Sequence, residues 1–100
     1  MTYQEISSKI LKTLGSGNFI NMTGATNFTV IQDGLQFDLP NPCKNDINQI
    51  QVILETSGTY TMRALKTHDL DRHEIRTESG LPREVLQMTF EYMTGMVASL

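Results

Sequence analysis

The stretch NFTVIQDGLQFDL, residues 27–39, decides the fold, because two alternating apolar segments flank an Asp-Gly pair. Asp33-Gly34 suits the positive backbone angles of a tight hairpin turn. Residues 27–31 and 35–39 each place apolar side chains at every second position, as a half-buried strand does. We therefore predict a β-hairpin made of these two segments.

The register of this hairpin can be predicted from the turn. We expect three cross-strand pairs: Gln32 with Leu35, Val30 with Phe37, and Phe28 with Leu39. In this register the large apolar side chains of both strands share one face, which is the face that a core would cover.

A second hairpin follows in the sequence. Residues 50–54 alternate and are apolar enough for a strand that is partly buried on both faces. Thr56-Ser57-Gly58 supplies a turn, and residues 59–65 alternate again. In that strand we expect three side chains to point inward: Tyr60, Met62 and Ala64.

Helices are predicted at both ends of the chain. Residues 2–14 carry apolar side chains three and four apart, Thr2 and Glu5 form a capping box, and Gly15 suits a helix end. Pro82 favours a helix start, and the closing helix is expected over about 82–93. Its core-facing stripe comprises Leu86, Thr89, Phe90, Met93 and Val97.

Residues 66–79 are highly charged and have little periodicity, so we expect a solvated loop with at most a short edge strand around 74–77. The predicted fold class is therefore α+β. A four-stranded antiparallel sheet of two hairpins carries the N-terminal and C-terminal helices on one face. A chain of 100 residues is long enough for one core, which predicts a single domain over residues 1–100.

Composition limits the functional classes. Eleven acidic and eight basic residues give a net charge of −3, which disfavours duplex binding through a broad basic face. Cys43 is the one cysteine, so an intrachain disulfide is impossible and a reducing cytoplasm is the expected setting. The start of the chain has an early acid and no long apolar run, which argues against a signal peptide or a membrane span.

The sequence offers little for catalysis. The segment His68–Glu74 is the densest in titratable groups, and a small metal-dependent hydrolase using His68, Asp71 and His73 is one alternative. The two histidines are five residues apart, which is not the spacing of a helical zinc pair. Cys43 beside Lys44 could act as a nucleophile, but no nucleophile elbow is present. We expect no enzyme activity, no cofactor and no resident metal.

Two groups of residues are candidates for binding a partner. The first is the acidic set Asp69, Asp71, Glu74 and Glu78, which could occupy a cationic nucleic-acid groove on another protein. The second is the edge of the closing helix that faces away from its core stripe, made of Met88, Glu91 and Tyr92. Adaptable methionines and aromatic side chains are frequent at contact surfaces, so this edge could hold a partner or a second copy.

Several strings resemble a family of small uncharacterised proteins of phages and other mobile elements. They are LKTLG at 11–15, NFINMTGATNF at 18–28, GLQFDLP at 34–40, residues 50–54 followed by TYTM at 59–62, and FEYMTG at 90–95. The Met-Thr-Gly-Ala-x-Asn-Phe core at 22–28 is fairly specific. Residues 66–79 lack the basic and aromatic character associated with the family.

The resemblance implies a small accessory protein that acts in the host cytoplasm by binding host or viral machinery. The leading hypothesis is a non-enzymatic binding protein, with an inhibitor of a host defence nuclease, of the anti-CRISPR kind, as its specific form. A nucleic-acid-binding accessory protein that uses Lys9, Lys12, Lys44 and Arg63 is a further alternative.

Overall fold

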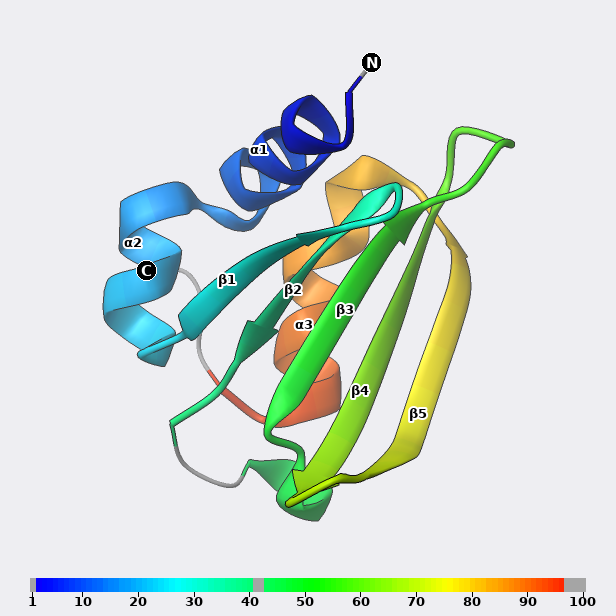
Figure 1. The fold of residues 1–100 in the computed structure, drawn as a ribbon. Helices are drawn as coiled ribbons and strands as arrows, with labels where there is room; N and C mark the ends of the chain where they lie inside the picture. The colour runs from blue at the N-terminus through cyan, green and yellow to red at the C-terminus, as the bar shows by residue number, and fades with distance from the viewer. Residues whose placement is uncertain (1, 41–42, 97–100) are drawn as a thin grey trace.

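The computed structural model describes residues 2–40 and 43–96. Within them, one antiparallel sheet joins five strands in chain order: β1 (Thr26–Ile31), β2 (Gly34–Asp38), β3 (Gln49–Leu54), β4 (Tyr60–His68) and β5 (Asp71–Leu81). Three α-helices lie on one side of this sheet (Figure 1): α1 (Tyr3–Leu14), α2 (Ser16–Thr23) and α3 (Leu86–Thr94). The predicted α+β class is correct, with one strand and one helix more than expected.

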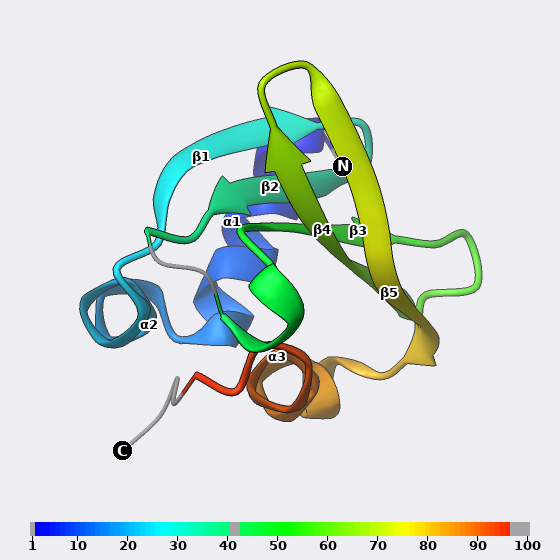
Figure 2. The same cartoon turned by 90° about the horizontal axis from the view of Figure 1, so that it is seen from below.

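The sheet is strongly twisted. Seen from below, β4 and β5 cross the direction of β1 and β2 at a steep angle (Figure 2). Twist of this kind follows from the right-handed preference of each strand and accumulates across the sheet. The helices fill the side on which the buried apolar side chains gather, and the opposite side of the sheet stays open.

The first hairpin forms with the predicted face and a different register. Val30 lies opposite Leu35, and Ile31 lies opposite Gly34, so the pairing is shifted by two residues from the expected one. A shift of two keeps each side chain on its face. The rings of Phe28 and Phe37 accordingly meet on the helix side, with centroids 5.3 Å apart.

The register differs because Gly34 belongs to the strand, not to the turn. Asp33 takes the positive φ of 57° that the turn needs. A Cβ at Gly34 would overlap the carbonyl oxygen of Val52 on the neighbouring strand, while the carbonyl of Gly34 accepts a hydrogen bond from the hydroxyl of Ser7. The glycine is therefore required for the close approach of β2 and β3 under α1.

The second hairpin agrees with the prediction. β3 pairs with β4, and the inward side chains Tyr60, Met62 and Ala64 are buried. The core also contains Ile50 and Val52 of β3, as expected for a strand with apolar residues on the helix side.

The N-terminal helix is confirmed, and a second helix was missed. Thr2 and Glu5 form the predicted capping box of α1, and Gly15 ends that helix with φ of 126°. The chain then re-enters a helix at Ser16 instead of a loop, and α2 ends at Gly24 in the left-handed conformation. One glycine and two asparagines lower the helix propensity of this segment, but Phe19 gives it a fully buried anchor.

The charged segment is also ordered differently from the prediction. Residues 66–68 extend β4, and 71–81 form β5, an edge strand of 11 residues instead of a solvated loop. Asp69, with φ of 54°, makes the tight turn between the two strands. Most of β5 is exposed, so it needs no apolar alternation, and periodicity could not reveal it.

The closing helix begins with a short 3-10 turn, η2 (Arg83–Val85), and continues as α3 to Thr94, with Gly95 as its left-handed C-cap. Leu86, Phe90 and Met93 of the predicted stripe are buried, and Thr89 is half-buried. Val97, the last member of that stripe, lies outside the described residues.

Gly34→Ala should lower the free energy of unfolding by about 1–3 kcal/mol, because the added methyl group forces β2 and β3 apart. Gly17→Ala is the matched control. It lies within α2 with no atom within 4 Å of the added carbon, so it should raise stability by about 0.5–1 kcal/mol. Urea unfolding followed by circular dichroism measures both. Equal effects of the two substitutions would contradict the proposed close approach.

Phe19→Ala should destabilise the protein by about 3–5 kcal/mol, because it empties a fully buried ring site. Asn18→Ala, an exposed neighbour on the same helix, should change stability by less than about 0.5 kcal/mol. The same unfolding measurement tests this pair, and a small effect of Phe19→Ala would mean that α2 is not packed on the sheet.

Candidate functional site

The structure separates the acidic residues that the sequence grouped. Asp69 and Asp71 lie at the exposed turn between β4 and β5, on either side of the fully exposed Leu70. Glu74 extends over the open side of the sheet and pairs with Arg63, with Oε1 3.4 Å from the Nε atom. Two of the four acids therefore lie at the hairpin tip, and a third forms an ion pair with an arginine.

Glu78, the fourth acid, points to the helix side of the sheet. Its Oε1 accepts a hydrogen bond of 2.9 Å from Nε of Arg76 and forms an ion pair with Nη2 of the same residue, also at 2.9 Å. Arg76 is the neighbour of Ala64, a core residue of β4, which places this pair beside α3. The four acids consequently do not form one continuous surface.

Tyr92 lies between two cationic side chains on the helix side. The guanidinium carbon of Arg76 is 4.7 Å from the ring centroid, and the ammonium of Lys44 is 5.2 Å from it. Arg76 also donates a hydrogen bond of 3.4 Å from Nη2 to the phenol oxygen. The hydrogen bond to Glu78, followed by that to Tyr92, raises the pKa of Arg76. The exposed ring of α3 is thus held in position by groups from two other segments of the chain, β5 and the turn at Lys44.

A hollow of about 260 Å³ opens beside this ring, between β5 and α3. It is lined by Glu78, Leu81, Met88, Thr89 and Tyr92. Met88 and Tyr92 are 64% and 56% exposed, which is high for large apolar side chains. Glu78, Met88 and Tyr92 were predicted partner-binding residues, and the structure brings them together. We call this group the Tyr92 surface. Glu91 is half-buried on α3 and is not among the lining residues.

The histidine segment lines a separate hollow on β4 and β5. Lys66, His68, Asp71, His73 and Ile75 line it. His68 Nε2 lies 3.5 Å from an oxygen of Asp69 at the exposed tip. In the described part of the chain, no three His, Cys, Asp or Glu side chains come close enough to hold a metal ion. The residues named for the hydrolase alternative are neighbours, but they do not form a ligand set there.

Cys43 precedes the 3-10 turn η1 (Lys44–Asp46) and is half-buried against the core. Burial raises the pKa of the Cys43 thiol. Lys44, which could have lowered that pKa, directs its ammonium to the ring of Tyr92. The environment therefore favours the thiol over the nucleophilic thiolate.

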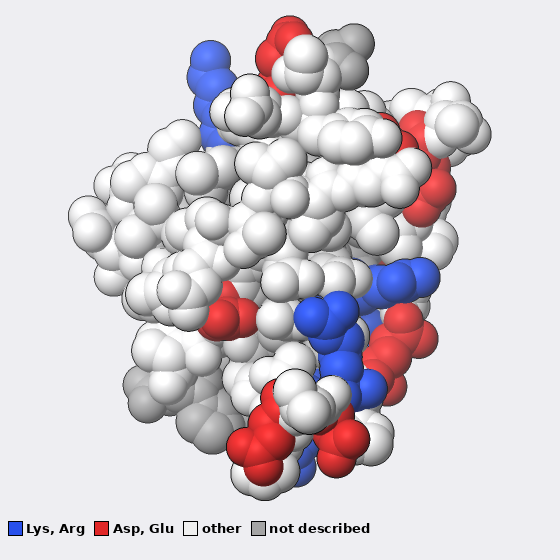
Figure 3. Space-filling model, viewed as in Figure 1, with Lys and Arg blue, Asp and Glu red and all other residues white. Residues whose placement is uncertain are grey.

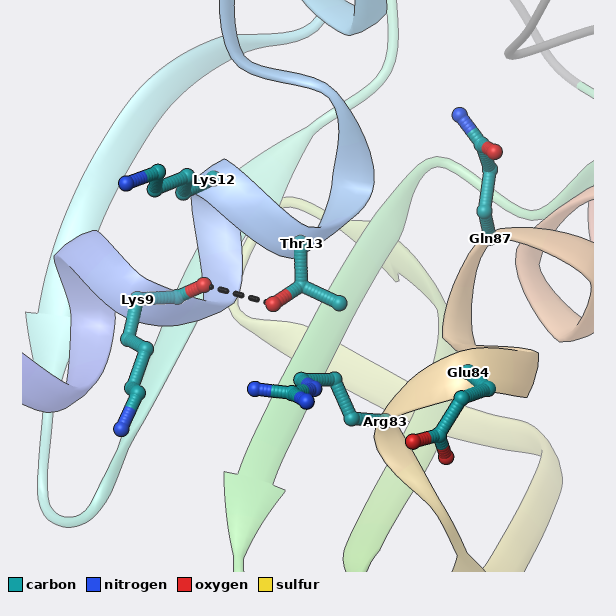
Figure 4. Close-up of a pocket in the computed structure, with 6 residues that line it drawn as sticks. All are labelled: Lys9, Lys12, Thr13, Arg83, Glu84 and Gln87. Atoms are coloured by element: carbon teal, nitrogen blue, oxygen red, sulfur yellow. Dashed lines mark hydrogen bonds between the residues drawn. The ribbon is translucent and has the colours of Figure 1, made fainter.

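The basic residues named for nucleic-acid binding are also divided. Lys44 lies at Tyr92, and Arg63 pairs with Glu74 on the open side of the sheet. Lys9 and Lys12 line a different hollow, of about 450 Å³, between α1 and the start of the closing helix (Figure 4). Thr13, Arg83, Glu84 and Gln87 complete its lining. Sequence reasoning missed Arg83, because only the packing of α3 against α1 brings it beside the two lysines.

The open side of the sheet carries hydrogen-bonded amide and carboxylate side chains. Asp38 accepts from Asn27 at 2.9 Å and from Gln49 at 3.1 Å, and Gln51 donates to Gln36 at 2.8 Å. Charged side chains gather toward the β4–β5 end of this side, and much of the remaining surface is uncharged (Figure 3). These amide groups mostly satisfy one another, which favours a structural role.

Compared with known proteins, the chain matches no protein-family model, no curated protein and no solved structure. The relation to small phage proteins therefore remains an expectation from sequence. Across residues 2–40 and 43–96, none of the helices has the length and apolar character needed to cross a bilayer.

Cys43 should react with iodoacetamide more slowly than the thiol of glutathione at pH 7.5. Its raised pKa leaves a smaller thiolate fraction at that pH, and the reaction should accelerate only as the pH approaches the higher pKa. Mass spectrometry of the alkylated protein from pH 7 to 10 measures the rate. The same protein in urea is the control and should react like glutathione, whereas a faster rate for the native thiol would reverse the predicted shift.

Proposed function

We propose that this chain is a small non-enzymatic protein that binds a partner protein through the Tyr92 surface. The observation that carries the proposal is the exposed Tyr92 ring, fixed by Arg76 and Lys44 at the edge of a hollow that also exposes Met88. Exposed aromatic side chains held in place lose little conformational freedom on binding, so they serve as strong anchors in interfaces.

The lining of the hollow favours a particular partner chemistry. Leu81, Met88 and Tyr92 offer apolar contact, and the flexible thioether of Met88 adapts to different shapes. Arg76 and Lys44 border the ring with positive charge, of which Glu78 compensates part. The surface therefore suits a protein segment that inserts an apolar side chain and carries acidic groups beside it.

The resemblance to phage and mobile-element proteins extends this proposal to a host or viral partner in the host cytoplasm. Its narrower form, inhibition of a host defence nuclease by acidic groups, draws support only from the acids at the hairpin tip. Asp69 and Asp71 are exposed there, whereas Glu74 and Glu78 are engaged by arginines. Contact through the Tyr92 surface is therefore the main proposal, and the acidic tip is secondary.

Tyr92→Ala should weaken partner binding about 10-fold or more, because it removes the anchor of the interface. Tyr3→Ala is the matched control, since Tyr3 is similarly exposed on α1 and lies outside the hollow. The partner is isolated from host lysate with the immobilised wild-type protein, and its affinity for all three forms is measured by biolayer interferometry. We expect Tyr92→Ala to weaken binding and Tyr3→Ala to leave the affinity unchanged.

Two results would contradict the proposal. One is a partner whose affinity is unchanged by Tyr92→Ala while thermal unfolding shows all variants folded. The other is a dimer in light scattering that Tyr92→Ala dissociates, since the surface would then hold a second copy. Charge reversal at Asp69 and Asp71, measured in the same binding assay, shows whether the hairpin tip contributes to the affinity in addition to the Tyr92 surface.

A further inference from the structure

We propose that the hollow between α1 and η2 is a binding site for the phosphate group of a small ligand. It uses residues separate from the Tyr92 surface, so this inference goes beyond the proposed function. Three cations line the hollow: Lys9 and Lys12 from α1, and Arg83 from η2. In Figure 4 the guanidinium of Arg83 extends across to α1, toward Lys9 and Thr13.

These cations are not neutralised within the described residues. Arg63, Lys66 and Arg76 pair with carboxylates, whereas Lys9, Lys12 and Arg83 form no ion pair there. Glu84 is the one acid that lines the hollow, and in Figure 4 its carboxylate turns toward the side on which Arg83 lies. Three positive charges and one negative charge leave a local charge of +2, in a chain whose net charge is −3. The uncompensated positive charge of the lining attracts an anion.

The walls of the hollow are held in place by hydrogen bonds. The side-chain amide of Gln87 donates to the carbonyl of Leu14 at 2.9 Å, which joins α3 to the end of α1. The hydroxyl of Thr13 donates to the carbonyl of Lys9 at 2.9 Å, so its oxygen can still accept within the hollow. Arg83 is thus offered to a ligand from a fixed wall instead of a mobile loop.

A phosphate monoester fits this arrangement better than a carboxylate. It carries about −1.5 to −2 charges at neutral pH, which matches the local charge, and its several oxygens can accept from Lys9 and Arg83 together. A planar guanidinium beside a flexible ammonium is a common arrangement for such groups. Inorganic phosphate and phosphorylated small molecules share this chemistry.

The test is a titration of the ¹⁵N-labelled full chain, followed by amide chemical shifts. Inorganic phosphate is one probe and glycerol 3-phosphate is the other, with chloride at matched ionic strength as the reference. We expect saturable shifts at residues 9–13 and 83–87 with phosphate groups and not with chloride. Tighter binding of glycerol 3-phosphate identifies a phosphorylated molecule as the ligand, and tighter binding of inorganic phosphate identifies the free ion.

Single substitutions test whether the residues that line the hollow bind the phosphate group. Arg83→Gln and Lys9→Gln should each raise the Kd about 3- to 10-fold, because each removes one charge-assisted contact at a partly solvated site. Arg72→Gln is the matched control. It removes one exposed cation of β5 that forms no ion pair in the described residues, so it should leave the Kd unchanged. Glu84→Gln should lower the Kd about 2-fold by removing the opposing charge.

Three results would overturn the proposal. The first is an absence of saturable shifts at residues 9–13 and 83–87 with both phosphate probes. The second is an equal loss of binding for Arg72→Gln and Arg83→Gln, which would mean that the net charge of the protein, and not a specific site, determines the affinity. The third is binding of a single-stranded oligonucleotide at these residues without binding of either small probe, which would assign the hollow to nucleic acid. The variants change exposed side chains, and thermal unfolding confirms that each remains folded.

Discussion

The contact among Phe19, Phe37 and Phe90 is the interaction on which the rest of the structure depends. Their ring centroids are 4.9–6.1 Å apart, and all three side chains are fully buried. One ring comes from α2, one from β2 and one from α3, so a single aromatic cluster holds two helices against β2. Because α3 is fixed there, Tyr92 faces β5 and Arg83 faces α1. Both candidate surfaces therefore depend on the same core.

Much of the fold could be predicted because its signals are local. A capping box, a C-terminal glycine and alternating strands identify α1, the first hairpin and β3–β4 from neighbouring residues alone. Two elements were missed for physical reasons. The helix α2 is short, contains Gly17 and Asn18, and depends on the tertiary contacts of Phe19 for its stability. The strand β5 is exposed on both sides and carries no apolar alternation. The predicted register of the first hairpin was wrong, because Gly34 is placed in the strand by its close approach to Val52 of β3, which the hairpin sequence alone does not reveal.

The candidate surfaces were predictable to a smaller extent. The stripe of the closing helix correctly placed Met88 and Tyr92 outside the core, because helical periodicity is a local property. The contacts of Arg76 and Lys44 with that ring could not be predicted, since they depend on β5 and on the segment after Cys43. The acidic set appeared continuous in sequence and is divided in space, because strand alternation and the register shifts of β5 send its carboxylates to different sides of the sheet.

The order of the strands has a consequence for folding kinetics. Each strand pairs with the strand next in the chain, so the sheet can grow by successive short loop closures, each with a small entropic cost. The closing helix is the exception, since the hydrogen bond of Gln87 to Leu14 joins residues 73 positions apart. Docking of that helix onto the first two is consequently the step with the longest loop to close. Until α3 docks, the part of the apolar side of the sheet that α3 covers stays exposed to solvent.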